Sequence, residues 1–237
     1  MLVAALIGEY LQAEQPATAT MSAVQQVARN FSEQTHGGPR DVQALLEWVQ
    51  AEQLRTDGLS EVQAHHSSLS WVLQNQQGLP IVRALLLIGI ARHGGYEAHG
   101  LNHPGHFLLR VEGVIVDPMA LEIVTLPAEN APAAQASPLD IALRMLNNLK
   151  HVAQRDQRWD EMLNLLDLQT ALCRLPQARA HLAALAFERG EVWLQLGGIA
   201  AAKAAYTDCL EQQPGTALAR QAENALKDLE SRDTQWH

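Results

Sequence analysis

Two residues whose types suit acid–base chemistry lie close together in the sequence, His106 and Asp117. The Glu-Gly dipeptide at 112–113 stands between them and fits the two-residue loop of a β-hairpin. With that loop Val111 pairs with Val114. His106 and Asp117 then share one face of the hairpin as diagonal neighbours, roughly 7–8 Å apart at the backbone. A carboxylate–imidazole hydrogen bond is within reach, and it would fix the tautomer and orientation of the ring.

A nucleophile to go with this pair is missing from the expected place. A catalytic thiol would stand at the start of a neighbouring helix, where the helix dipole and an imidazolium lower its pKa. The apolar helix that precedes the hairpin starts with Pro80, which is a good first helical residue but has no nucleophilic atom. The two cysteines, Cys173 and Cys209, lie far downstream in apolar helical sequence, and we expect both to be small buried hydrophobic residues.

Other polar residues near the hairpin are candidates for binding. We assign Asn102, His103 and His66 to contacts with a ligand or partner, although Asn102 also suits the cap of a loop turn. His99, His103 and His106 have spacings of four and three residues, which leaves zinc as an alternative. They flank a Pro-Gly loop rather than one helix face, so we expect no metal and no other cofactor.

The sequence around these residues predicts helices and strands that together make a mostly helical α+β fold. We expect helices over 2–12, 21–31, 42–53 and 67–76, and a central helix with a small antiparallel sheet over 76–126. Asp41 is the expected cap of the third helix. The Ala- and Pro-rich stretch 127–138 predicts a linker. The predicted division is a first domain over 1–130, a linker over 131–138 and a helical domain over 139–237.

The helical tail contains one recognisable repeat. Small and aromatic residues fall on the spacing of the 34-residue tetratricopeptide pattern. They are Gly190, Trp193, Leu196, Gly197, Ala202, Tyr206 and Pro214. An earlier copy over 146–176 is degenerate, and 217–229 predicts a capping helix. Because a solenoid needs about three repeats, we expect this tail to pack against the first domain.

The motifs together resemble the SirB1-like family, a branch of the transglutaminase-like superfamily. The resemblance covers roughly residue 40 to the end, and the residues that carry it are Ser67-x-Leu69, Gly78-x-Pro80, Asn102-x-Pro104-Gly105-His106-Phe107-Leu108-Leu109-Arg110 and Asp117-Pro118. It implies a papain-like core and a tetratricopeptide-type tail, with glycine-x-proline as the common form in the family. This chain departs from the pattern at His66, His103 and Gln76-Gln77, where the family tends to have asparagine, phenylalanine and an arginine pair.

Composition limits the classes of function that the protein can have. The 237 residues are 47% hydrophobic and 18% charged, as in globular proteins, and the net charge of −9 argues against nucleic acid. Two cysteines fit a reducing compartment, and the apolar segment 1–7 is too short for a membrane span or signal, so we expect a cytoplasmic protein. The resulting hypothesis is a non-catalytic scaffold that binds a protein partner. The alternatives are a hydrolase in which His106 and Asp117 activate water, and the histidine metal site.

Overall fold

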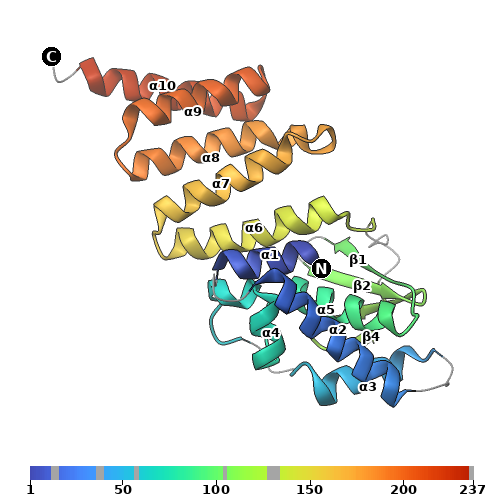
Figure 1. The fold of residues 1–237 in the computed structure, drawn as a ribbon. Helices are drawn as coiled ribbons and strands as arrows, with labels where there is room; N and C mark the ends of the chain where they lie inside the picture. Colours follow the sequence, from blue (N-terminus) through green and yellow to red (C-terminus); the bar gives the residue numbers. More distant parts are fainter. Residues whose placement is uncertain (12–15, 36–39, 56–58, 104–105, 127–133, 235–237) are drawn as a thin grey trace. The chain divides into compact units, whose positions relative to one another are not determined.

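The computed structural model describes residues 1–11, 16–35, 40–55, 59–103, 106–126 and 134–234. The chain divides into two compact units, Met1–Asn148 and Leu149–His237, with the division inside one helix. The first unit holds α1 (Leu2–Leu11), α2 (Ala17–Gln34), α3 (Val42–Glu52), the 3-10 helix η1 (Ala64–Ser67), α4 (Leu69–Asn75), α5 (Pro80–His93), strands β1 (Ala98–His103), β2 (His106–Val111), β3 (Val114–Asp117) and β4 (Glu122–Val124), and the start of α6 (Pro138–Arg155). The second unit holds the end of α6, α7 (Trp159–Cys173), the 3-10 helix η2 (Pro176–His181), α8 (Leu182–Gln195), α9 (Ile199–Gln212) and α10 (Ala217–Thr234) (Figure 1).

The four strands form one antiparallel sheet in the order β1-β2-β3-β4. The predicted hairpin is confirmed, since Val111 pairs with Val114 across the turn at 112–113. Helix α5 packs against β1, β2 and α2. Ten of its residues are buried, which explains why its sequence is apolar on every side.

The start of α5 is fixed by close packing of the segment before it. Gly78 lies so near Val72 that an added Cβ would come within 2.3 Å of the Val72 Cγ2 atom. The backbone N–H of Leu79 donates to the carbonyl oxygen of His66 at 3.0 Å. Pro80 is then the first helical residue, where the absence of an N–H costs nothing. The glycine-x-proline sequence therefore joins α4 to α5 with little space between them.

Strand β1 corrects one detail of the sequence prediction. Asn102 was expected to suit the cap of a loop turn, but it lies in β1, opposite Phe107 of β2, and His103 follows it opposite His106. Residues 134–136, inside the predicted linker, also pair with β1. The N–H of Asn102 donates to Ala134 at 3.1 Å, and the N–H of Ala136 donates to Gly100 at 2.9 Å. This stretch therefore covers the outer edge of the sheet, while 127–133 of the same prediction lies outside the described residues.

In the second unit, close contacts between small and aromatic residues join the helices. A Cβ on Gly190 of α8 would come within 2.5 Å of the Tyr206 ring of α9, and one on Gly198 within 2.8 Å of the Trp193 ring. Tyr206 is fully buried and donates to a Glu191 carboxylate oxygen. Burial and the Glu191 carboxylate raise the pKa of Tyr206 well above its ordinary value.

No helix in the described part of the chain is long and apolar enough to cross a membrane.

Candidate functional site

The backbone brings the three predicted positions to one end of the first unit. His106 opens β2 and Asp117 closes β3, so the hairpin register puts both at the end of the sheet opposite the 112–113 turn. Arg83, one turn after Pro80 on α5, donates from Nε to the carbonyl oxygen of Pro118 at 2.8 Å. This bond holds the first turn of α5 beside the residues that follow Asp117. The predicted strand pairing of the hairpin is present, while the placement of His106 against the helix start stays a prediction.

The side chains of the predicted pair do not interact as expected. The Asp117 carboxylate accepts the backbone N–H of Met119 at 2.7 Å and that of Ala120 at 3.4 Å. The N–H of Leu121 also donates to the Asp117 carbonyl oxygen at 2.9 Å. Within the described residues Asp117 forms no hydrogen bond with His106, whose side chain is exposed. The expectation of a carboxylate–imidazole bond is therefore wrong. Oδ1 instead accepts from the turn after Asp117, as aspartate commonly does at the start of a turn.

The neighbouring candidates have separate partners. Asn102 accepts a hydrogen bond at 3.1 Å from Nη1 of Arg144 on α6. The same guanidinium lies 5.7 Å from the ring centroid of Phe107, within the range of a cation–π contact. His103 is half-buried opposite His106, and their ring centroids are 6.5 Å apart. Asn102 thus joins β1 to α6, and it does not cap a loop turn.

Comparison with known protein families identifies the superfamily of the first unit. A model of the transglutaminase-like superfamily matches residues 16–147, which run from the segment before α2 into α6. The chain belongs to the transglutaminase-like superfamily. Similar proteins carry the name UPF0162 protein. Those of Xylella fastidiosa strains 9a5c and Temecula1 are each 29% identical over 196 residues, covering 73% of this chain and 67% of the relative. That of Pseudomonas aeruginosa is 28% identical over 167 residues, covering 62% of each chain. No solved structure matches the chain significantly.

The transglutaminase-like domain carries no thiol at the helix start. Pro80 occupies the first helical position of α5. Cys173 and Cys209 are both buried in the second unit, as the sequence predicts. Burial raises the pKa of each thiol, and for Cys173 it outweighs the opposing effect of Lys150. A raised pKa leaves less thiolate at neutral pH, so neither cysteine has the activated form that acyl transfer requires.

His66 is a structural residue of the domain core. Its side chain is only 6% exposed, and Nδ1 accepts the backbone N–H of Gln63 at 2.9 Å. Its ring lies edge-on to those of His65 and Trp71, with centroids 4.4 and 4.7 Å away. Burial, and after it the neighbouring His65, lower the pKa of His66 below its ordinary value. His66 thus forms part of the capping box at the start of η1, beside the start of α5, and its assignment to a ligand or partner contact stays a prediction.

The three-histidine alternative gains no support from the described residues. His99 and His103 lie four residues apart on β1, which places their backbones roughly 13 Å apart at the usual rise of a strand. With zinc–nitrogen bonds of about 2 Å, one ion would need both rings to extend toward each other along the strand. In the part of the chain that the structure describes, no group of three or more potential ligands could hold a metal.

Two residues of this region escape prediction from the sequence. Arg83 is fully buried, and its guanidinium donates to three carbonyl oxygens, those of Pro118, Met119 and Arg55. The available signal is an arginine inside an otherwise apolar helix, because a buried arginine requires several acceptors. Ser67 is 1% exposed, and its Oγ has no hydrogen-bond partner within the described residues. Nothing in the sequence marks that hydroxyl as different from its neighbours.

Proposed function

We propose that this member of the transglutaminase-like superfamily is a non-catalytic scaffold or regulatory protein that binds another protein. The observation that carries the proposal is Pro80 at the first position of α5, where acyl transfer needs a nucleophile. The absence of a hydrogen bond between Asp117 and His106 within the described residues adds support, because an oriented imidazole would need one; Asp117 Oδ1 instead accepts from the turn that follows it. The water-activating alternative needs that orientation, and no contact of His106 in the described residues favours it.

The finer family assignment belongs to the same proposal. The glycine-x-proline sequence at 78–80, with the Pro-Gly-His-Phe-Leu-Leu-Arg run, supports a SirB1-like protein with a papain-like core. The packing of Tyr206 on Gly190 and of Trp193 on Gly198 supports a tetratricopeptide-type arrangement in the second unit. A cytoplasmic location remains part of the proposal, and two unpaired buried cysteines are consistent with a reducing compartment.

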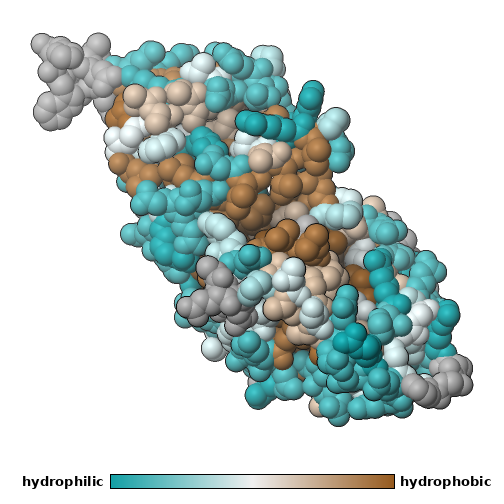
Figure 2. Space-filling view, in the orientation of Figure 1, coloured by the Kyte–Doolittle hydropathy of each residue, from teal (hydrophilic) through white to brown (hydrophobic). Residues whose placement is uncertain are grey.

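The second unit offers apolar surface for a protein partner. Figure 2 shows hydrophobic residues gathered over the region of α7 and α8. Leu168 on α7 and Leu175 just beyond it are seven residues apart and 42% and 45% exposed. Leu196 and Ile199, at the turn between α8 and α9, are 37% and 39% exposed. A contiguous apolar patch on a protein surface commonly marks a place that another protein covers, whereas single exposed side chains do not; the gathering in Figure 2 is therefore what supports a partner here.

The absence of catalysis is tested by looking for an acyl-enzyme. We expect intact-mass spectrometry to detect no adduct after incubation with a glutamine-donor substrate or with iodoacetamide under native conditions. Pro80→Cys is the positive control, because a thiol at the first position of α5 has its pKa lowered by the helix dipole. It should react faster than Gln25→Cys, an exposed mid-helix position on α2. A stoichiometric adduct in the wild-type domain would overturn the proposal.

The binding role is tested with paired surface variants. Crosslinking and mass spectrometry should recover a protein with the wild-type chain and lose it with Leu168→Asp/Leu175→Asp. Ile123→Asp is the matched control, because Ile123 on β4 is an equally exposed apolar residue at 45%. Capture that is unchanged in the double variant, or lost equally in the control, contradicts a binding surface on α7.

A further inference from the structure

A cavity of about 200 Å³ lies at the β1 edge of the sheet, away from the positions of His106 and Asp117. Its floor consists of buried side chains of α5, Leu85 and Ile88, and α6 contributes Ile141. The backbone of Gly100 and the small side chain of Ala136 form the wall beside the sheet. All of these residues belong to the first unit. The cavity has about the volume of six or seven waters, which leaves room for a ligand of roughly six to ten heavy atoms.

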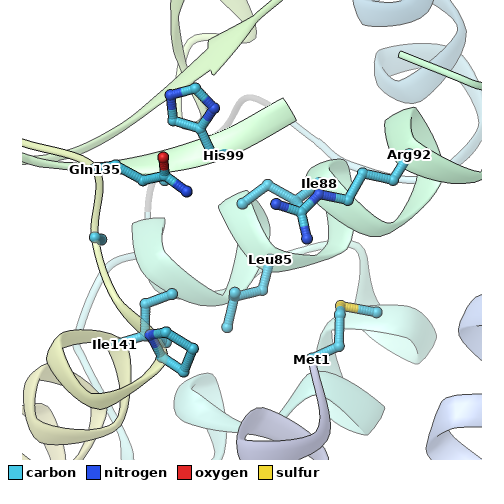
Figure 3. Close-up of a pocket in the computed structure, with 10 residues that line it drawn as sticks. Met1, Leu85, Ile88, Arg92, His99, Gln135 and Ile141 are labelled. Carbon is cyan, nitrogen blue, oxygen red and sulfur yellow. The ribbon is translucent and has the colours of Figure 1, made fainter. Parts of the chain in front are cut away.

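The cavity is polar at one side only. Figure 3 shows the Arg92 guanidinium and the Gln135 amide directed toward the space between them, above the aliphatic chains of Leu85 and Ile141. Arg92 and Gln135 are exposed, so this side is the mouth of the cavity. The His99 ring points away from the other labelled side chains (Figure 3), because it lies on the face of β1 that it shares with Arg110.

Arg92 at this mouth has a fixed position and an unmatched charge. Its Nε donates to the carbonyl oxygen of Ala98 at 2.7 Å, which anchors the guanidinium between α5 and β1. None of the described residues that line the cavity carries a carboxylate, and Arg92 has no ion-pair partner in the described part of the chain. Guanidinium nitrogens that remain available at a cavity mouth suit a carboxylate, which can accept two parallel hydrogen bonds.

We propose that this cavity binds a small free carboxylate with a short apolar chain. The carboxylate bonds to Arg92 and Gln135, and the apolar chain lies against Leu85, Ile88 and Ile141. A cavity of this size is below the range that takes drug-sized ligands, so the occupant has roughly six to ten heavy atoms. The proposal does not depend on the scaffold role, because the cavity and the surface on α7 share no residue.

The test uses the full chain with hexanoate as the probe, at pH 7.5 and constant ionic strength. We expect saturable shifts of the Ile88 and Ile141 δ1-methyl signals in NMR spectra of methyl-labelled protein, with Ile123 unmoved. The neutral analogue 1-hexanol and the cation hexylamine have the same chain and should bind at least about tenfold more weakly, as expected for loss of a charge-assisted pair. Equal binding of either analogue, or no saturation with hexanoate, would overturn the proposal.

Substitutions test the charged mouth of the cavity and its apolar interior one at a time. Arg92→Gln should weaken hexanoate binding at least about tenfold while leaving hexanol unchanged. Ile141→Trp should fill the space and abolish binding of both. Arg29→Gln, an exposed arginine on α2, is the control and should bind as the wild type does. Circular dichroism confirms folding of each variant. Because Ile141→Trp keeps every charge, full hexanoate binding in that variant refutes the site even if Arg92→Gln fails to fold.

The C-terminus of a peptide also carries a carboxylate. One further binding measurement distinguishes a free small carboxylate from a peptide C-terminus. The peptide N-acetyl-Gly-Gly-Leu presents the same group with a branched apolar side chain but cannot enter a 200 Å³ cavity whole. Hexanoate should bind more tightly than this peptide. Tighter binding of the peptide would assign the site to protein C-termini and overturn the free-ligand proposal.

Discussion

Replacing Arg83 tests whether the central helix and the strand end form one structural unit. The guanidinium is fully buried and reaches three carbonyl oxygens, at 2.8 Å for Pro118, 2.6 Å for Arg55 and 3.1 Å for Met119. These residues lie 35, 28 and 36 positions away in the sequence. The side chain therefore connects α5 to the segment after α3 and to the turn between β3 and β4. Arg83→Ala removes all three connections at once.

The expected loss can be worked from the exposure of the three acceptors. The Pro118 carbonyl is buried, so leaving it without a donor costs about 1–3 kcal/mol. Arg55 is exposed and Met119 half-buried, so water can reach those two oxygens and lessen their cost. The buried charge itself had a desolvation cost, which its removal recovers in part. We expect a decrease of about 2–4 kcal/mol in the free energy of unfolding, a large share of the 5–15 kcal/mol typical of a domain.

The assay has to report the stability of each of the two units separately. Native-state hydrogen exchange does so, because amides report the opening of their own region. In Arg83→Ala the amide of Leu121, which donates to Asp117, should exchange much faster, while amides of α8 and α9 in the second unit keep their rates. Arg83→Met keeps the volume and isolates the hydrogen bonds, and it should lose about 1–3 kcal/mol.

The control variant replaces an arginine at the surface of α2. Arg29→Ala removes an exposed arginine whose hydrogen bond in the described part of the chain goes to Gln26, three residues away, and it should change stability by less than about 0.5 kcal/mol. If urea unfolding gives Arg83→Ala a stability within about 1 kcal/mol of the wild type, the three carbonyl contacts do not hold the domain together. The interpretation of Arg83 as a structural link would then be abandoned.

Three further predictions concern the same region. Gly78→Ala should destabilise the first unit by about 1–3 kcal/mol, because its Cβ meets the Val72 Cγ2 atom at 2.3 Å; Val72→Ala should restore part of the loss, and urea titration of the double variant checks this. Burial lowers the pKa of His66, so the unfolded chain takes up the proton first. Stability should therefore fall as pH drops below about 6.5, by at most about 1.4 kcal/mol per pH unit for one histidine. His66→Asn keeps an acceptor for Gln63 and should flatten this slope in melts between pH 7.5 and 5.5, whereas an unchanged slope contradicts the assignment. Asp117→Ala should cost about 1 kcal/mol by removing the turn's acceptor, and Asp117→Asn should retain most of the stability; equal losses in calorimetry would count against a capping role.

The sequence predicted the strand register and the helix start because both follow from local rules. A two-residue turn sets the pairing of Val111 with Val114, and proline sets the beginning of α5. Asp41 likewise caps α3 as expected, with its carboxylate accepting the N–H of Gln43 at 2.9 Å. Each prediction depends on residues within a few positions of one another.

The predictions that failed depend on contacts between distant segments. Nothing near Asn102 shows that residues 134–136 return to pair with β1, since an Ala- and Pro-rich stretch carries no strand pattern. The three carbonyls around Arg83 come from two such segments. The burial of His66 could not be predicted, because it depends on packing against Trp71 and beside the α4–α5 junction. In each case, burial is decided by the tertiary structure.

Asp117 shows why a correct register is not enough to establish a catalytic pair. The backbone geometry puts its carboxylate on the same face as His106, as a catalytic dyad requires. Both N–H groups of the turn bond to Oδ1, and no hydrogen bond joins the carboxylate to His106 within the described residues. A carboxylate has lone pairs on two oxygens, so the bonds at Oδ1 do not by themselves prevent an imidazole from bonding at Oδ2. A dyad also requires the imidazole to be held beside that second oxygen, whereas the side chain of His106 is exposed at the start of β2. Arg83 donates to the carbonyl oxygens of Pro118 and Met119 and so fixes the turn that sets the position of the acid, but nothing comparable fixes the imidazole among the described residues.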